Sequence, residues 1–182
     1  MVSDSCNGVG DLHNIRLCIE LSLEPEKVNK IRAFAPLHDI GKILVPNDIL
    51  NKRGKLTDEE FEIMKKHVEY GGKLLGESEY FEIARNIALY HHEKYDGSGY
   101  LKGLKGEEIP IEATIVALVD VYDVLRSERP YKRALFHKEA LKIVLEGDGR
   151  TKPQHFDPKL LEILKENSEE IKHVWEEINN RR

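Results

Sequence analysis

The segment IPIEATIVALVDVYDVL, residues 109–125, limits the folds open to this chain more than any other stretch. It is strongly apolar and has the length of one helix, a combination typical of a helix that other helices cover. The remaining sequence contains apolar residues at helical spacing and no convincing alternation of strand type. The sequence therefore predicts an all-α fold, a helical bundle with this segment as its buried central helix.

Helix start signals and glycines place the other elements around the central helix. Thr57 and Glu60 have the spacing of a capping box, and Asp157 followed by Pro158 is typical of a helix start. The stretch after His92 is rich in glycine and predicts a loop before the central helix. We expect further helices over residues 12–23, 26–40, 55–75, 78–92, 137–147 and 157–178.

Length and composition indicate one domain and exclude some kinds of partner. The chain of 182 residues can form one core, which we place at residues 12–182, after a leader or truncated upstream segment at residues 1–11. A net charge of -5 with both signs interspersed gives no basic footprint for a DNA or RNA duplex. No apolar run has the length of a membrane segment, and no signal peptide is recognisable. With Cys6 and Cys18 as the only thiols, these features predict a cytoplasmic location.

Several histidines lie near the apolar side of an expected helix. His38 and Asp39 end the stretch AFAPLHDIGK, and imidazole with carboxylate suits a first-row divalent ion. The same pair also suits a polar helix end at the surface. His67 fits a hydrogen-bonded core histidine as well as a ligand, and His91 with His92 fits a favourable placement at a helix C-terminus. Each residue taken alone leaves both interpretations open.

Asp120 interrupts the most apolar helix of the chain. A carboxylate buried there costs several kcal/mol unless a cation or hydrogen-bond donors compensate it. Asp123 follows three residues later and leans to the same side, where an ion pair with Arg126 or Lys132 would account for it. Ligand-type residues recur near the apolar stripes of four expected helices. This coincidence favours a metal as the partner of Asp120.

Three motifs in this order give the chain a family resemblance. HDIGK at residues 38–42, HHEKYDGSGY at 91–100 and LVDVYDVLRSERPYK at 118–132 resemble the HD-GYP family of HD-superfamily phosphohydrolases. The likeness extends from His13 or the HD motif to FDPKLLEIL at residues 156–164. It implies an HD-domain-like helical bundle, which agrees with the all-α prediction. It also implies a metal-dependent phosphodiesterase that hydrolyses cyclic di-GMP to pGpG, and onward to GMP.

The resemblance further implies roles for the residues that match the family's motifs. Asp39 would bridge two divalent ions, iron or manganese first, with zinc, nickel or cobalt as alternatives, and a hydroxide between them would attack the phosphodiester. Lys42 matches the lysine that contacts the scissile phosphate. Tyr100, Arg129 and Lys132 match the substrate side. The implied metal ligands are His38, Asp39, His67, His91, His92 and Asp120, with His13 as an additional histidine of the first helix.

The signature departs from the family at one position, where Leu101 follows Gly99 and Tyr100 in place of proline. Proline fixes φ and removes a donor, so we expect Leu101 to leave the loop looser. This departure supports an alternative function, a catalytically weak module that binds a cyclic dinucleotide or another protein. The implied partners are cyclic di-GMP or a related cyclic dinucleotide and a diguanylate cyclase (GGDEF) or regulatory domain. An apolar stripe on the last helix would close the core or form a homodimer.

Overall fold

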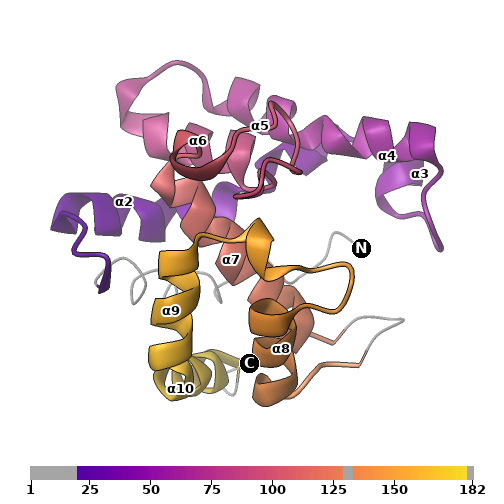
Figure 1. The fold of residues 1–182 in the computed structure, drawn as a ribbon. Coiled ribbons are helices and arrows are strands. Elements are labelled where there is room, and N and C mark those ends of the chain that lie inside the picture. The colour runs from indigo at the N-terminus through magenta and orange to yellow at the C-terminus, as the bar shows by residue number, and fades with distance from the viewer. Residues whose placement is uncertain (1–19, 129–132, 180–182) are drawn as a thin grey trace.

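The computed structural model describes residues 20–128 and 133–179, and all regular structure within these ranges is helical (Figure 1). The all-α prediction is confirmed. The α-helices are α2 (Pro25–Phe34), α3 (Asn47–Leu50), α4 (Asp58–Lys65), α5 (His67–Leu75), α6 (Glu82–Tyr90), α7 (Ile111–Arg126), α8 (His137–Glu146), α9 (Pro158–Glu166) and α10 (Ser168–Asn179). Short 3₁₀ helices are η2 (Ala35–Leu37), η3 (Ile40–Leu44), η4 (Glu79–Phe81), η5 (Gly106–Glu108) and η6 (Pro153–His155).

Helix α7 is the buried central helix that the sequence predicts. Figure 1 shows it running from the group formed by α4, α5 and α6 to the group formed by α8, α9 and α10. Leu118 and Tyr122 belong to the main core cluster together with residues of α8, α9 and α10. Val116 joins a second cluster with Phe34 of α2 and Ile87 of α6. Since burial of apolar area is the main favourable term in folding, α7 ties the two groups of helices together.

The expected helix over residues 26–40 is shorter than predicted. Helix α2 ends at Phe34, and the chain continues through η2, a turn at His38 and Asp39, and η3. Pro36 accounts for the difference, because a proline inside a helix lacks the N–H donor and its ring clashes with the preceding turn. His38 and Asp39 therefore lie in a turn between two 3₁₀ helices, not near the end of a long helix.

Two other expected helices are each divided into two. The segment 55–75 bends at Lys66 between α4 and α5, and the segment 157–178 is interrupted at Asn167 between α9 and α10. At Asn167 the side-chain amide donates to the carbonyl of Ile163 at 3.0 Å. A side chain that satisfies one of the last carbonyls of a helix favours termination at that point. The capping signals are confirmed: Thr57 and Glu60 form both halves of the box, and the Asp157 carboxylate caps α9.

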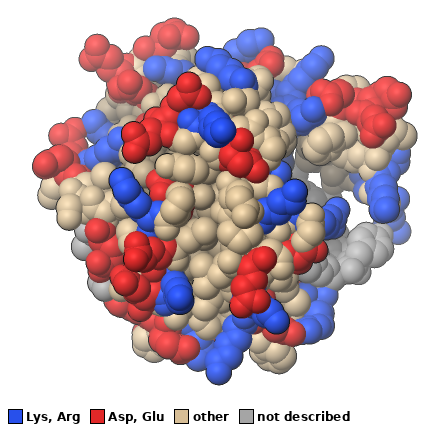
Figure 2. Space-filling view, in the orientation of Figure 1, with Lys and Arg blue, Asp and Glu red and all other residues tan. Residues whose placement is uncertain are grey.

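The polar surface agrees with the composition. Figure 2 shows Lys and Arg mixed with Asp and Glu over the face in view, without a continuous basic patch on that face. Among the described residues, none of the helices has the length and apolar character needed to cross a membrane.

The backbone of η3 lies directly against α5, and a glycine makes this approach feasible. A Cβ at Gly41 would lie 1.9 Å from the carbonyl oxygen of His67 and 2.4 Å from the backbone nitrogen of Gly71. Both atoms belong to backbone, so neither can move aside cheaply. Gly41 therefore fixes how closely the His38–Asp39 turn can approach the histidine that begins α5.

We expect Gly41→Ala to lower the free energy of unfolding by more than about 3 kcal/mol, because the added methyl group must push η3 away from α5. The same displacement should reduce bound metal. Urea denaturation and elemental analysis measure the two effects. Gly54→Ala is the matched control: nothing lies within 4 Å of that position, although its φ of +124° adds some strain. Equal metal content in both variants would contradict the argument.

Candidate metal centre

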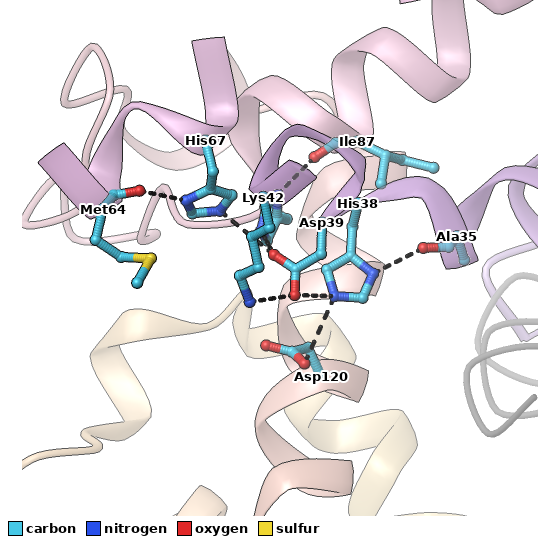
Figure 3. A network of polar contacts seen from close by, with 9 residues as sticks. Ala35, His38, Asp39, Lys42, Met64, His67, Ile87 and Asp120 are labelled. Carbon is cyan, nitrogen blue, oxygen red and sulfur yellow. Dashed lines mark hydrogen bonds and ion pairs between the residues drawn. The ribbon is translucent and has the colours of Figure 1, made fainter. Parts of the chain in front are cut away.

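Three histidines of the site are held in the same way. The Nδ1 atom of His38 lies 2.8 Å from the carbonyl oxygen of Ala35, and His67 has the same contact with Met64 at 2.8 Å (Figure 3). His91 contacts the carbonyl of Ile87 at 3.0 Å. A carbonyl only accepts, so each Nδ1 must carry the proton. This tautomer leaves the lone pair on Nε2, the atom that each ring directs toward the middle of the site.

Asp39 lies between these imidazoles. Its Oδ1 atom is 3.4 Å from Nε2 of His67 and 3.8 Å from Nε2 of His91. Its Oδ2 atom is 3.3 Å from Nε2 of His38 and forms an ion pair with Lys42. The two oxygens of one carboxylate therefore face two different sets of groups. This is the arrangement of a carboxylate that can serve two cations.

His92 completes the group from the loop side. Its ring stacks on Tyr100 with centroids 4.9 Å apart and planes 27° from parallel. Possible ligand atoms of Asp39, His67, His91 and His92 all lie within 4.8 Å of one another. Because η3, α5 and the end of α6 meet here, adjacent His91 and His92 both reach the same centre.

Asp120 lies at the edge of this group and is less buried than predicted. Its side chain is 31% exposed, and Oδ1 is 3.9 Å from Nε2 of His38 (Figure 3). Asp120 is therefore only partly buried, although its place in the apolar segment predicts burial. Asp123 is the buried acid, and it accepts a hydrogen bond from the indole of Trp175 at 3.0 Å.

Burial and charge set the protonation of the site. Burial raises the pKa of Asp39, but the contact with His38 and the ammonium of Lys42 outweigh it, so this pKa lies well below the usual range. Burial lowers the pKa of His92 to about 3, with repulsion from His67 as a further cause. Burial and then repulsion from His92 hold the pKa of His91 well below its usual value. A carboxylate anion and neutral imidazoles are the forms that bind a cation.

The residues present fit a divalent metal. The Nε2 atoms of His67 and His91 are buried and form no hydrogen bond within the described part of the chain. A buried polar atom without a partner is unfavourable, and here each carries a lone pair that faces a carboxylate. Imidazole nitrogen with carboxylate oxygen is a donor set that suits first-row divalent ions. His13, Arg129 and Lys132, which the sequence also singles out, lie outside the described residues.

Glu93 anchors the glycine loop beside the site. Its carboxylate, in a residue only 3% exposed, accepts the backbone N–H groups of Leu101, Lys102 and Gly103 at 3.0, 2.6 and 3.2 Å. Leu104 donates to the second oxygen at 3.1 Å. Hydrogen bonds to an ionised acceptor are the strong ones, and four of them compensate the burial of this charge. The N–H of Leu101 is one of the four, a contact that proline could not make.

Gly99 brings Tyr100 onto His92. A Cβ at this position would lie 2.4 Å from the nitrogen of Lys94 and 2.5 Å from the Cα of Glu93. Only glycine allows the loop to pass so close to the end of α6.

Sequence reasoning did not assign Glu93 or Gly41 a role. The sequence did contain a signal for both residues, because Glu93 directly follows His91 and His92, and Gly41 lies two positions after Asp39.

The sequence matches the HD domain family over residues 10–160. A cyclic di-GMP phosphodiesterase of Vibrio cholerae is 46% identical over 149 residues, which are 78% of this chain and 30% of that protein. The cyclic di-GMP phosphodiesterase response regulator RpfG of Xanthomonas campestris is 44% identical, over 85% of this chain and 40% of that protein. A 3'3'-cGAMP-specific phosphodiesterase of Vibrio cholerae is 41% identical, over 86% of this chain and 30% of that protein. The chain thus spans less than half the length of these curated relatives.

A solved structure of an HDG"Y"P protein from Bdellovibrio bacteriovorus has the same fold. It is 25% identical, with a TM-score of 0.66, over 91% of this chain and 53% of that chain. Fold and site together define an all-helical protein with a histidine and aspartate cluster at the meeting point of its helices. The chain belongs to the HD domain family and, within it, to the HD-GYP group.

We expect Glu93→Gln to lower the free energy of unfolding by about 2 kcal/mol or more, because a neutral amide cannot accept four backbone N–H groups as well as a carboxylate does. Loss of this anchor should also loosen the stacking of Tyr100 on His92 and reduce bound metal. Thermal denaturation and elemental analysis report both changes. Glu82→Gln, at an exposed position in the first turn of α6, is the control. If both variants behave alike, Glu93 does not anchor the loop.

Proposed function

We propose that this chain is a metal-dependent phosphodiesterase that hydrolyses a cyclic dinucleotide, cyclic di-GMP first, to pGpG and onward to GMP. The observation that carries the proposal is the convergence of Asp39 with His67, His91 and His92 in a buried group whose ligand atoms lie within 4.8 Å of one another. The names of the relatives, which specify cyclic di-GMP or 3'3'-cGAMP, support the substrate class.

Two divalent ions fit the arrangement of the carboxylate. Oδ1 of Asp39 faces His67 and His91, which with His92 would hold one ion. Oδ2 faces His38, whose Nε2 lies 3.9 Å from Asp120, so these two residues would hold the other. The imidazole-rich set favours iron or manganese, with zinc, nickel and cobalt as alternatives. When bound, two such ions acidify a water molecule and neutralise phosphate charge.

Lys42 and Tyr100 are the described residues that would act on the substrate. The side chain of Lys42 is 29% exposed, so its ammonium can meet a phosphate oxygen from the rim of the site and stabilise charge that grows there. Tyr100 borders a cavity of about 200 Å³, which two lysines, Lys65 and Lys66, and two glutamates, Glu62 and Glu69, also line. Lys65 pairs with Glu62, so the charges of the cavity balance, and the ring of Tyr100 is the feature that suits stacking against a base. By resemblance, Arg129 and Lys132 would bind on the same side.

The proposal also covers location and partners. It places the reaction in the cytoplasm, and it takes a diguanylate cyclase (GGDEF) or a regulatory domain as partner. The much greater length of the relatives, one of which is named a response regulator, supports a regulatory partner.

Ile171 of α10 is 2% exposed and packs in the core, so the last helix closes the bundle. A homodimer would need the outer face of that helix.

The first test is turnover. Protein purified without oxygen and loaded with iron or manganese should convert cyclic di-GMP to pGpG, resolved by chromatography, with 3'3'-cGAMP as the comparison substrate. Asp39→Asn should lower kcat more than a hundredfold, because losing several kcal/mol of stabilisation has at least that effect. Asp48→Asn, at an exposed position of α3, should leave kcat unchanged. Unchanged substrate with a demonstrably metal-loaded site would refute the proposal.

The same experiment decides between enzyme and binding module. A catalytically weak module would bind cyclic di-GMP without turnover, and its affinity would not respond to Asp39→Asn. The loop geometry favours the enzyme, because the N–H of Leu101 donates to Glu93 and the departure from proline leaves His91 and His92 in place.

Lys42→Met separates the role of the ammonium from that of the metal. We expect kcat to fall about a hundredfold, as when one positioned group that stabilises transition-state charge is removed. Metal content should stay equal or rise, because a positive charge next to Asp39 disappears. Elemental analysis and kinetics on the same preparation check both. Lys55→Met, an exposed lysine, is the control. A parallel loss of metal would show that Lys42 supports the ligands instead.

A further inference from the structure

A second cavity lies at the opposite end of α7 from the metal centre. Its volume is about 410 Å³, within the range of small-molecule sites. Figure 1 shows α8 and α10 beside this end of α7, away from α5 and α6. The lining residues come from α7, the start of α8 and α10: Arg126, Ala134, Leu135, Phe136, His137, Lys138, Lys172, Trp175 and Glu176.

Arg126 is a buried cation with one donor, Nε–H, that no described group accepts. The residue is 5% exposed, and its Nε atom has no hydrogen-bond partner within residues 20–128 and 133–179. The nearest acid is Glu176, whose carboxylate lies 3.6 Å from Nη2. The guanidinium packs on the ring of Trp175 at 4.1 Å from its centroid. Stacking holds the guanidinium plane in place, and the Nε–H remains available to an anion in the cavity.

The start of α8 adds further donors to the same cavity. The N-cap residue is Phe136, which has no side-chain acceptor, and no described group accepts from the backbone N–H of His137 or Lys138. The positive end of a helix with unpaired N–H groups attracts anions. The nearby carboxylate of Glu139 is already bonded to Arg133 at 2.8 Å and to the Phe136 N–H at 2.9 Å.

The charge of the cavity is positive on balance. Lys138 is exposed and forms no ion pair with any described residue. Lys172 is partly neutralised by Glu169 at 3.2 Å. The other walls are apolar or aromatic, and Phe136 is 75% exposed at the rim. A ligand therefore meets cations on one side and apolar surface on the other.

We propose that this cavity is a second ligand site, which takes a small organic anion. Its carboxylate or phosphate would lie at the start of α8 near Arg126 and Lys138, and its planar apolar part would lie against Trp175 and Phe136. The proposal does not depend on the activity of the metal centre, because none of these residues belongs to that site.

Trp175 makes the test direct, because it is the only tryptophan of the chain. Its fluorescence is followed while metal-loaded protein is titrated with phenyl phosphate, which has both a phosphate and an aromatic ring. We expect a saturable change, competition by inorganic phosphate and no response to benzyl alcohol, which lacks the charge. The result should be the same in Asp39→Asn, so a failure of the proposed phosphodiesterase activity leaves this test intact.

Charge reversal on α8 supplies the matched variants. Lys138→Glu should weaken binding of phenyl phosphate about tenfold, since reversing a charge close to the anion is worth more than 1 kcal/mol. An acid in the first turn suits the helix dipole, so the fold should be kept. Lys142→Glu, on the same helix outside the cavity, should leave the affinity unchanged. No saturable response, equal effects of the two variants, no competition by phosphate, or a response to benzyl alcohol would each overturn the proposal.

Discussion

Contact between two pieces of backbone determines whether this molecule has a site at all. The turn that carries His38 and Asp39 must lie against α5 for the carboxylate to come within 3.4 Å of the His67 ring. Gly41 permits this approach, because any larger residue would collide with the carbonyl of His67 itself. Gly41 follows His38 by three positions and Asp39 by two, so one short motif, HDIGK, contains both the ligands and the residue that allows their approach to α5.

Helix ends orient the ligands once that contact exists. The carbonyls that hold Nδ1 of His67 and His91 belong to Met64 and Ile87, in the last turns of α4 and α6. The carbonyl of Ile87 also accepts the backbone N–H of His91 at 3.1 Å, and a carbonyl oxygen with two lone pairs can accept a ring N–H as well. The end of α6 is therefore a suitable place for two adjacent histidine ligands. The helix end fixes the tautomer of His91, and the following loop places Tyr100 on His92.

Periodicity was sufficient for the helical class and for α7, because a long apolar segment has few alternatives. The ligand set came from motif resemblance, and the structure gathers Asp39, His67, His91 and His92 without testing their roles. What local patterns missed were contacts between distant segments. The four donors to Glu93 come from residues 101–104, and their convergence depends on how the loop folds back over α6. Breaks within long helical patterns were also missed where a single residue, such as Pro36, decided the outcome.

Two acids on α7 illustrate the same limit. Asp120 and Asp123 are three residues apart and look equivalent in sequence, yet one is 31% exposed beside His38 and the other is buried against α10. Trp175 donates to Asp123, and Arg126, one of the two partners expected for it, lies 3.6 Å from Glu176; the other, Lys132, lies outside the described residues. Three residues rotate by about 300°, about 60° short of a full turn, and rise about 4.5 Å along the axis, which is enough for the two carboxylates to face different neighbours. The contacts of each carboxylate therefore distinguish the two residues. Asp120 lies beside the candidate metal centre, and Asp123 holds α10 through Trp175.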